Sequence, residues 1–230
     1  MAKKILEKQI ENRFFSNLIN QENKFDNSAV KVYQKLVFLR YFELIKNSFP
    51  LFVEQISQEE LEETIKAFMK DTPTTAFIWQ MANDYRKFLK KNKIFDSRKH
   101  LYEVLYYDWI EIEIYMKEYK IKKPKNFSYK NSYKLSPSAR VKRFKYDIIN
   151  HNFDLKKEIF LVIYYNFDSN EVVYRELNQL IYEVLKSLDK NNSIEKILKN
   201  ICITNDIDAK EAKAILKPAF NELYINKVFI

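Results

Sequence analysis

The chain contains no glycine in 230 residues. At an average usage of about 7%, roughly 16 glycines would be expected in a chain of this length. Phosphate loops and dinucleotide-binding turns need glycine where the backbone approaches the ligand. The P-loop, the Rossmann fingerprint and the glycine-rich kinase loop are therefore excluded. Turns that need a positive φ must use another residue, and asparagine is the one expected there.

The composition favours a folded protein outside the membrane. Hydrophobic residues make up 47% of the chain and aromatic residues 16%, which excludes a wholly disordered chain. The longest apolar run, Ile159–Tyr165, is shorter than the about 20 residues that cross a bilayer. The N-terminal residues do not resemble a signal peptide. The single cysteine, Cys202, excludes an internal disulfide. A cytoplasmic location is expected.

The net charge of +9 is unevenly distributed. Residues 1–120 carry 20 basic and 18 acidic groups, whereas residues 121–230 carry 20 basic and 13 acidic groups. Between Lys120 and Lys145 there are ten basic residues and no acidic one. Because lysine is abundant throughout (33 Lys against 7 Arg), the total alone indicates no nucleic-acid role. An anionic partner is more readily expected at the second half.

Apolar residues recur every three or four positions in the first half, which predicts an all-α domain over residues 1–120. Ser57 and Glu60 match a capping box at the start of one helix. The expected helices are Lys3–Asn17 (within an N-terminal extension helix of residues 1–25), Ser28–Asn47, Ser57–Lys70, Thr75–Lys91 and Ser97–Tyr119.

The second half changes its pattern after a basic linker over residues 121–137. Residues 138–230 are predicted to form a winged-helix-like α+β domain with a three-stranded sheet, so the whole chain is mainly α. The expected strands are Arg140–Ile149, Glu158–Asn166 and Glu171–Leu177. The expected helices are Leu180–Leu188, Ser193–Cys202 and Asp208–Asn226. Asn178 is the expected cap of the first, and the third opens with a capping-box pattern at Asp208 and Glu211.

No catalytic or metal site is predicted. The acidic residues fall into two groups, Glu59, Glu60, Glu62 and Glu63 at a helix start, and Glu103, Asp108, Glu111 and Glu113 near His100. Carboxylates at a helix start favour the helix dipole, and a di-iron bundle needs Glu-x-x-His pairs that the chain lacks. Cys202 lies on an apolar helical stripe and is expected to be a buried thiol. We therefore expect a protein that is not an enzyme and that holds no cofactor.

Three binding modes stay open. The run Lys120–Lys145, with Phe127, Tyr129 and Tyr133, suits single-stranded nucleic acid, an acidic peptide or a plain linker. A winged helix can place a helix in the DNA major groove, and Ser193–Cys202 or Asp208–Asn226 would be that helix. An exposed strand at a sheet edge can instead accept an extended peptide, and Glu171–Leu177 is the candidate strand.

Several motifs in a fixed order resemble the HvfC/BufC family over about residues 28–230. The features are Tyr41, Phe49-Pro50, Phe88-Leu89 and Asp108-Trp109-Ile110-Glu111, followed by the segment LSPSARVKRFKYDI (135–148), a hairpin and helices. That family is often labelled a DNA-binding domain. Relatives of the MbnC kind are non-catalytic partners of multinuclear non-haem iron oxygenases, which modify cysteines in ribosomally made precursor peptides.

The resemblance implies a protein–protein interaction role for this chain. It would present a Cys-containing precursor peptide to an iron-dependent oxygenase as its heterodimer partner, with the iron held by that enzyme. The C-terminal domain is also similar in element order to PqqD-like modules, which bind a leader peptide along the third strand and the last helix. The residues expected to bind the peptide are Val172, Val173, Tyr174, Arg175, Glu176, Lys213, Lys217 and Phe220. A DNA-binding regulator is the alternative function.

Overall fold

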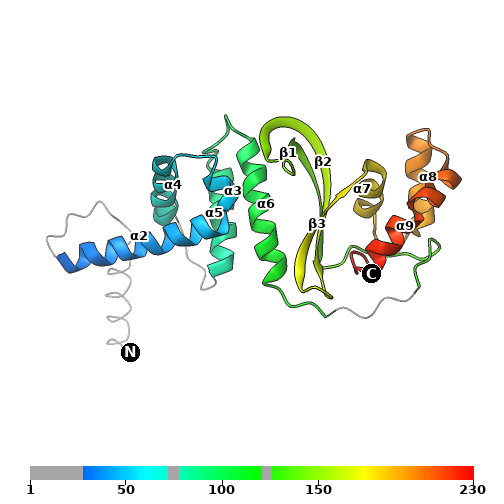
Figure 1. Cartoon of the computed structure of the whole chain (residues 1–230), viewed down its shortest axis with the longest axis horizontal. Coiled ribbons are helices and arrows are strands. Elements are labelled where there is room, and N and C mark those ends of the chain that lie inside the picture. Colours follow the sequence, from blue (N-terminus) through cyan, green and yellow to red (C-terminus); the bar gives the residue numbers. More distant parts are fainter. Residues whose placement is uncertain (1–27, 72–77, 121–125) are drawn as a thin grey trace, which may run out of the picture. The chain divides into compact units, whose positions relative to one another are not determined.

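The computed structural model describes residues 28–71, 78–120 and 126–230 (Figure 1). The chain is mainly helical, with one three-stranded antiparallel sheet in its C-terminal part, which confirms the expected fold class at that level. It divides into two compact units, Met1–Trp109 (unit 1) and Ile110–Ile230 (unit 2). The division falls inside a helix, whereas the sequence suggested a division after residue 120.

Unit 1 contains only helices among its described residues. They are α2 (Ser28–Ser48), α3 (Pro50–Val53), α4 (Gln58–Asp71), α5 (Ile78–Lys91) and the first part of α6 (His100–Tyr115). The capping box before α4 is formed, because the Glu60 amide donates to the Ser57 hydroxyl at 3.1 Å and the Ser57 amide donates to Glu60 at 3.0 Å. Helix α6 begins three residues after Ser97 and ends before Tyr119. The expected N-terminal helix lies outside the described residues.

Several of the motifs that suggested a family resemblance lie in unit 1. The short helix α3 starts at Phe49-Pro50, and Phe49 provides no side-chain cap. The carboxylate of Asp108 supplies one, because its Oδ2 accepts a hydrogen bond from the Phe52 amide at 3.0 Å. The guanidinium of Arg86 lies 4.4 Å from the ring of Trp109. These residues therefore have a structural role within unit 1.

The sheet of unit 2 is an antiparallel meander in the order β1-β2-β3. Its strands are β1 (Ala139–Asp147), β2 (Asn152–Asn166) and β3 (Glu171–Leu177). Strand β3 pairs with β2 in one unbroken register. Strand β1 pairs with β2 less regularly, with shifts on either side of Tyr146. Strand β2 begins six residues before its predicted start, and β3 has the predicted bounds.

Three helices follow the sheet, each with a side-chain N-cap. They are α7 (Gln179–Lys186), α8 (Ile194–Thr204) and α9 (Ala209–Ile225). Their caps are Asn178, Ser193 and Asp208, and each side chain accepts a hydrogen bond from the amide three residues on. Such a cap stabilises a helix by about 1 kcal/mol. Helices α8 and α9 begin one residue after their predicted first residues, Ser193 and Asp208, which are their caps, and Asn178 is the predicted cap of α7.

The expected linker contributes to the core of unit 2. Tyr129 and Tyr133 are buried in the same cluster as residues of α7, α8 and α9. The Tyr129 hydroxyl donates to the carbonyl of Lys213 at 3.0 Å, and burial raises the pKa of Tyr129 to about 12. Backbone bonds of 2.9 Å in both directions also join Lys134 to Ile230. Residues 126–137 are therefore a packed segment of the fold.

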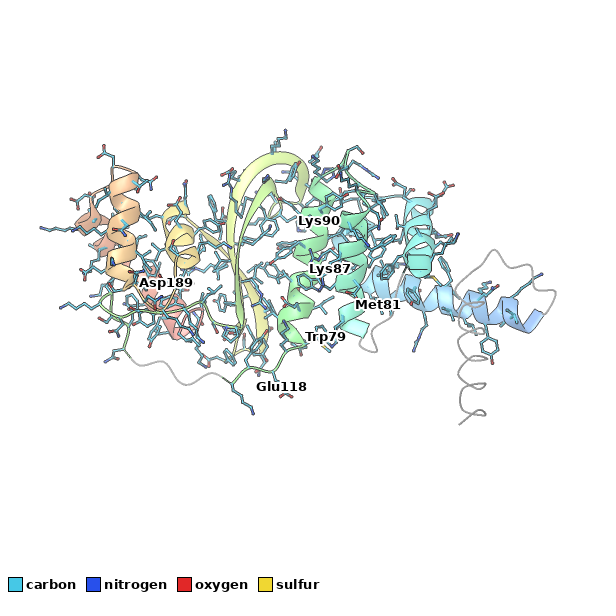
Figure 2. All side chains as sticks on the ribbon, turned by 180° about the vertical axis from the view of Figure 1, so that it is seen from behind. Trp79, Met81, Lys87, Lys90, Glu118 and Asp189 are labelled. Atoms are coloured by element: carbon cyan, nitrogen blue, oxygen red, sulfur yellow. The ribbon has the colours of Figure 1, made fainter. Side chains whose placement is uncertain are left out.

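Turns without glycine use several residue types. The hairpin turn between β2 and β3 contains Asn170 at φ 58°, as expected for asparagine. The other described positive-φ residues are Lys93, His151, Lys190, Asp206 and Lys227, so asparagine is not the general substitute. Between α7 and α8, Asp189 (Figure 2) accepts amide bonds from Asn191 and Asn192, both at 2.9 Å. This Asx turn orders the loop locally.

Candidate functional site

Two of the acidic side chains singled out in the sequence, Glu60 and Glu113, have structural roles. No group of three or more His, Cys, Asp or Glu residues is placed to hold a metal ion in the part of the chain that the structure describes. Glu60 completes the capping box and pairs with Arg98. Glu113, which is buried, accepts from both Arg140 and Lys117. Burial alone would raise the pKa of Glu113, but these two cationic donors lower it below its ordinary value.

The cysteine is a buried thiol. Cys202 is fully buried in the core cluster of unit 2. Burial, with a smaller contribution from the charge of Asp208, raises the pKa of the Cys202 thiol. Because the thiolate is the reactive form, both effects make this residue a poor nucleophile.

Two of the three aromatic rings singled out in the basic run Lys120–Lys145 are buried, and Phe127 is partly buried against the same core. The rings of Tyr129 and Tyr133 lie in the core, with exposed fractions of 7% and 5%. They cannot stack on bases in this structure, which corrects the expectation that all three rings accompany the cations. Two cations of the run also form ion pairs within the chain, Arg140 with Glu113 and Arg143 with Glu158.

The sheet has an open edge at β3. Every ladder partner of β3 lies on β2, and no further strand pairs with β3 among the described residues. The C-terminal residues Val228–Ile230 pair with the segment before β1, not with β3. Successive amides of a strand point to opposite sides, so half of the β3 amides and carbonyls face away from the sheet. These groups can receive an added strand.

The two edges of the sheet differ in their side chains. Strand β1 carries four basic residues, Arg140, Lys142, Arg143 and Lys145. Charged side chains, lysine above all, are a common device against unwanted edge pairing. Strand β3 has an uncharged centre, Val172-Val173-Tyr174. Of the two edges, β3 is therefore the better acceptor of another chain.

Helix α9 lies beside β3 and presents an apolar stripe. Arg175 of β3 and Glu222 of α9 form an ion pair at 2.7 Å. Ile215, Pro218 and Ile225 share a helical face with Glu222, because these four residues recur at intervals of three or four. The side chains of Ile215 and Ile225 are 67% and 63% exposed. We call these four residues the α9 stripe.

The three residues of α9 that were predicted to contact the peptide lie in different environments. Phe220 is fully buried in the core, which corrects the expectation that its ring contacts a bound peptide. Lys213 pairs with Glu195 and lies 5.1 Å from the ring of Tyr129. Lys217 is exposed. The sequence prediction missed the α9 stripe. Its isoleucines, Ile215 and Ile225, do not fall on the helical face of the buried residues Leu216 and Phe220, and this offset could have indicated a second apolar face.

A hollow lies where β3 runs into α7. Two adjoining cavities of about 270 and 360 Å³ share Asn178, Leu180 and Ile207. The complete lining consists of Asn178, Gln179, Leu180, Glu183, Asn205, Ile207, Asp208, Glu211, Ala212, Ile215 and Leu216. We call this the α7–α9 hollow. It meets the α9 stripe at Ile215. Each of its two cavities is close to the lower limit of about 300 Å³ for small-molecule pockets, so the hollow suits one or two side chains.

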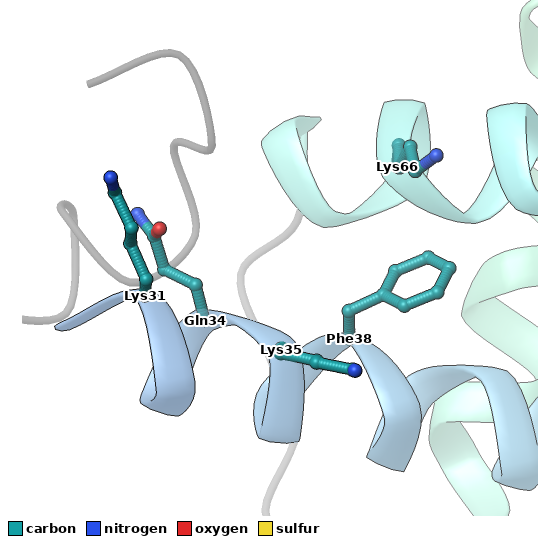
Figure 3. A pocket seen from close by; sticks show the side chains of 5 residues that line it. All are labelled: Lys31, Gln34, Lys35, Phe38 and Lys66. Atoms are coloured by element: carbon teal, nitrogen blue, oxygen red, sulfur yellow. The ribbon is translucent and has the colours of Figure 1, made fainter. Parts of the chain in front are cut away.

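Unit 1 has a separate, basic hollow of about 350 Å³. Figure 3 shows its lining, with four side chains from α2 and Lys66 from α4. Lys66 pairs with Glu62 at 3.4 Å and lies 5.4 Å from the ring of Phe38. Part of the positive charge is thus already balanced within unit 1.

The comparisons assign no family. No protein-family model matches the chain, and no curated protein matches it either. None of the helices that the structure describes has both the length and the apolar character needed to cross a bilayer.

Proposed function

We propose that this chain is a non-catalytic peptide-binding partner protein, in which unit 2 holds an extended peptide along β3. The observation that carries the proposal is the open edge of β3 next to the α9 stripe. Backbone bonds to β3 would supply affinity, and alternate peptide side chains would contact the α9 stripe for specificity. Val172–Glu176 remain the proposed contacts on the strand, and Lys217 remains one on α9.

The finer assignment rests on the resemblance to the HvfC/BufC family. In this proposal the peptide is a Cys-containing precursor, and the chemistry belongs to an iron-dependent oxygenase that forms a heterodimer with this cytoplasmic chain. The winged-helix-like, PqqD-like description of residues 138–230 is part of the same proposal. The order of three strands followed by three helices supports it.

A binding experiment tests the use of the β3 edge. The probe is the fluorescein-labelled peptide Gln-Leu-Thr-Val-Thr-Val-Thr-Leu-Gln, which has β-forming residues at its centre. Two further versions carry N-methyl groups on alternate amides, one version on the odd positions and one on the even positions. We expect the parent peptide to bind the full chain and at least one methylated version to lose binding, because a strand added to β3 needs its amides on one side. Equal binding of all three peptides would contradict the proposal.

A reconstitution experiment tests the role beside an enzyme. The components are the full chain, an iron-dependent oxygenase of the proposed partner class and a Cys-containing precursor peptide. We expect cysteine modification to require the chain. Modification at full rate and affinity without it would contradict the proposal. Sequence-selective retardation of duplex DNA at physiological salt would instead favour the DNA-binding alternative.

A further inference from the structure

The α7–α9 hollow is an apolar depression that the described fold leaves uncovered. Leu180, Ile207 and Ile215 contribute its exposed apolar surface, and the side chain of Ile207 is 44% exposed. Its position at the end of β3 places it in reach of a peptide that pairs with this strand, because Asn178, which follows Leu177 directly, lines both cavities. The hollow can therefore take a side chain from the end of that peptide.

The charged lining of the hollow is entirely acidic. Its only charged residues are Glu183, Asp208 and Glu211, and no Lys or Arg lines either cavity. Glu183 accepts from Gln179 at 2.8 Å, and Asp208 accepts from the amide of Glu211 at 2.7 Å. The carboxylate of Glu211 has no ion-pair partner within the described residues.

Two helix N-termini oppose this negative charge but do not cancel it. Asn178 and Asp208, the caps of α7 and α9, both line the hollow. Each helix start carries about half a positive charge, so the two offset about one of the three carboxylates. The remaining charge of about −2 favours a cation over an anion.

We propose that the α7–α9 hollow binds an apolar side chain of the extended peptide together with an adjacent Lys or Arg that lies against Glu211. This inference rests on the proposed function, since it concerns the same peptide. It assigns the peptide a basic-apolar anchor, whereas the charge distribution of the sequence indicated an anionic partner for the second half of the chain.

Peptides that differ only at their ends test the anchor. The parent peptide of the previous section is compared with versions that carry Lys or Glu in place of both terminal Gln residues, and with a Lys version in which Ser replaces both Leu residues. The symmetric design presents the same anchor in either strand direction. We expect the Lys peptide to bind up to about fivefold more tightly than the Gln peptide, as for an exposed ion pair, and the Glu peptide to bind least tightly. Replacing Leu by Ser should weaken binding about tenfold.

Matched variants of the full chain locate the effect. Glu211→Lys should reverse the preference between the Lys and Glu peptides. Glu59→Lys is the control, because Glu59 is also exposed and lies in the first turn of a helix, but belongs to unit 1. Ile215→Ser should weaken the binding of the peptides that carry Leu, whereas Ile203→Ser should leave that binding unchanged. The two isoleucines are a matched pair because both are about two-thirds exposed, at 67% and 68%.

The outcomes separate the two proposals. Equal affinity of the Lys, Gln and Glu peptides, with N-methylation still abolishing binding, would overturn the anchor and leave the β3 edge in place. An unchanged preference in Glu211→Lys would also overturn it. Failure of every peptide to bind would overturn both proposals.

Discussion

Replacing Phe220 by alanine tests whether this ring belongs to the core of unit 2 or to its peptide surface. The side chain is fully buried. Its ring centroid lies 5.9 Å from that of Tyr129, 6.2 Å from that of Phe127 and 6.3 Å from that of Phe229. Truncation of a buried phenylalanine typically costs about 3–5 kcal/mol. We expect Phe220→Ala to lower the free energy of unfolding of unit 2 by this amount.

The reactivity of Cys202 with a thiol reagent measures that loss inside unit 2. Cys202 is the only cysteine and is fully buried in the same cluster as Phe220. Where labelling requires opening of the core, the rate follows the population of the open state. A loss of about 3–5 kcal/mol then raises the labelling rate by roughly two to nearly four powers of ten.

Ile215→Ala is the matched control on the same helix. Its side chain is 67% exposed, so the free energy of unfolding should change by less than about 0.5 kcal/mol. A Phe220→Ala protein that labels within threefold of the wild-type rate but binds the parent peptide more weakly would refute the description of this ring as core.

Two other substitutions test buried polar contacts. Glu113→Gln should make the stability of the protein depend less on pH at acid pH. Lys117 and Arg140 lower the pKa of Glu113 in the folded state below the ordinary value of 4.5. The ionised carboxylate therefore contributes fully to the free energy of unfolding above pH 4.5, and this contribution is lost as the pH falls through the native pKa. Urea unfolding between pH 7 and pH 3 measures this, and parallel curves for wild type and variant would contradict it. Tyr85→Phe removes the buried 2.7 Å bond between Tyr85 and Thr64 and should cost about 1 kcal/mol at pH 7. Tryptophan fluorescence during urea unfolding measures that loss, and an unchanged midpoint would show that the bond contributes nothing.

The sequence predicted the features that local chemistry determines. Ser57, Asn178 and Asp208 each cap a helix as expected, because the capping bond joins residues only three positions apart. The bounds of β3 were also predicted, since Val172-Val173-Tyr174 has strong β preference and a turn precedes it.

Features that depend on distant residues were missed. The first residues of β2, Asn152–Lys157, mix polar and apolar types and lack the dense β-forming run that follows. They extend the strand through irregular pairing with β1, including Asp147 with Asn152. Tyr129 and Tyr133 were assigned to a linker because their core partners, such as Phe229, lie about one hundred residues further along the chain. The candidate site was predicted in part: the strand of the open edge was identified, but the acidic hollow depends on α7, α8 and α9 meeting in space.

Hydrogen exchange at the amides of Val172–Leu177, measured by NMR on the free full chain, tests the central claim most directly. An open β3 edge predicts alternation along the strand, with protected amides that face β2 and fast-exchanging amides between them. Uniform protection of all six amides would mean that the edge is already covered and would contradict the proposed peptide binding.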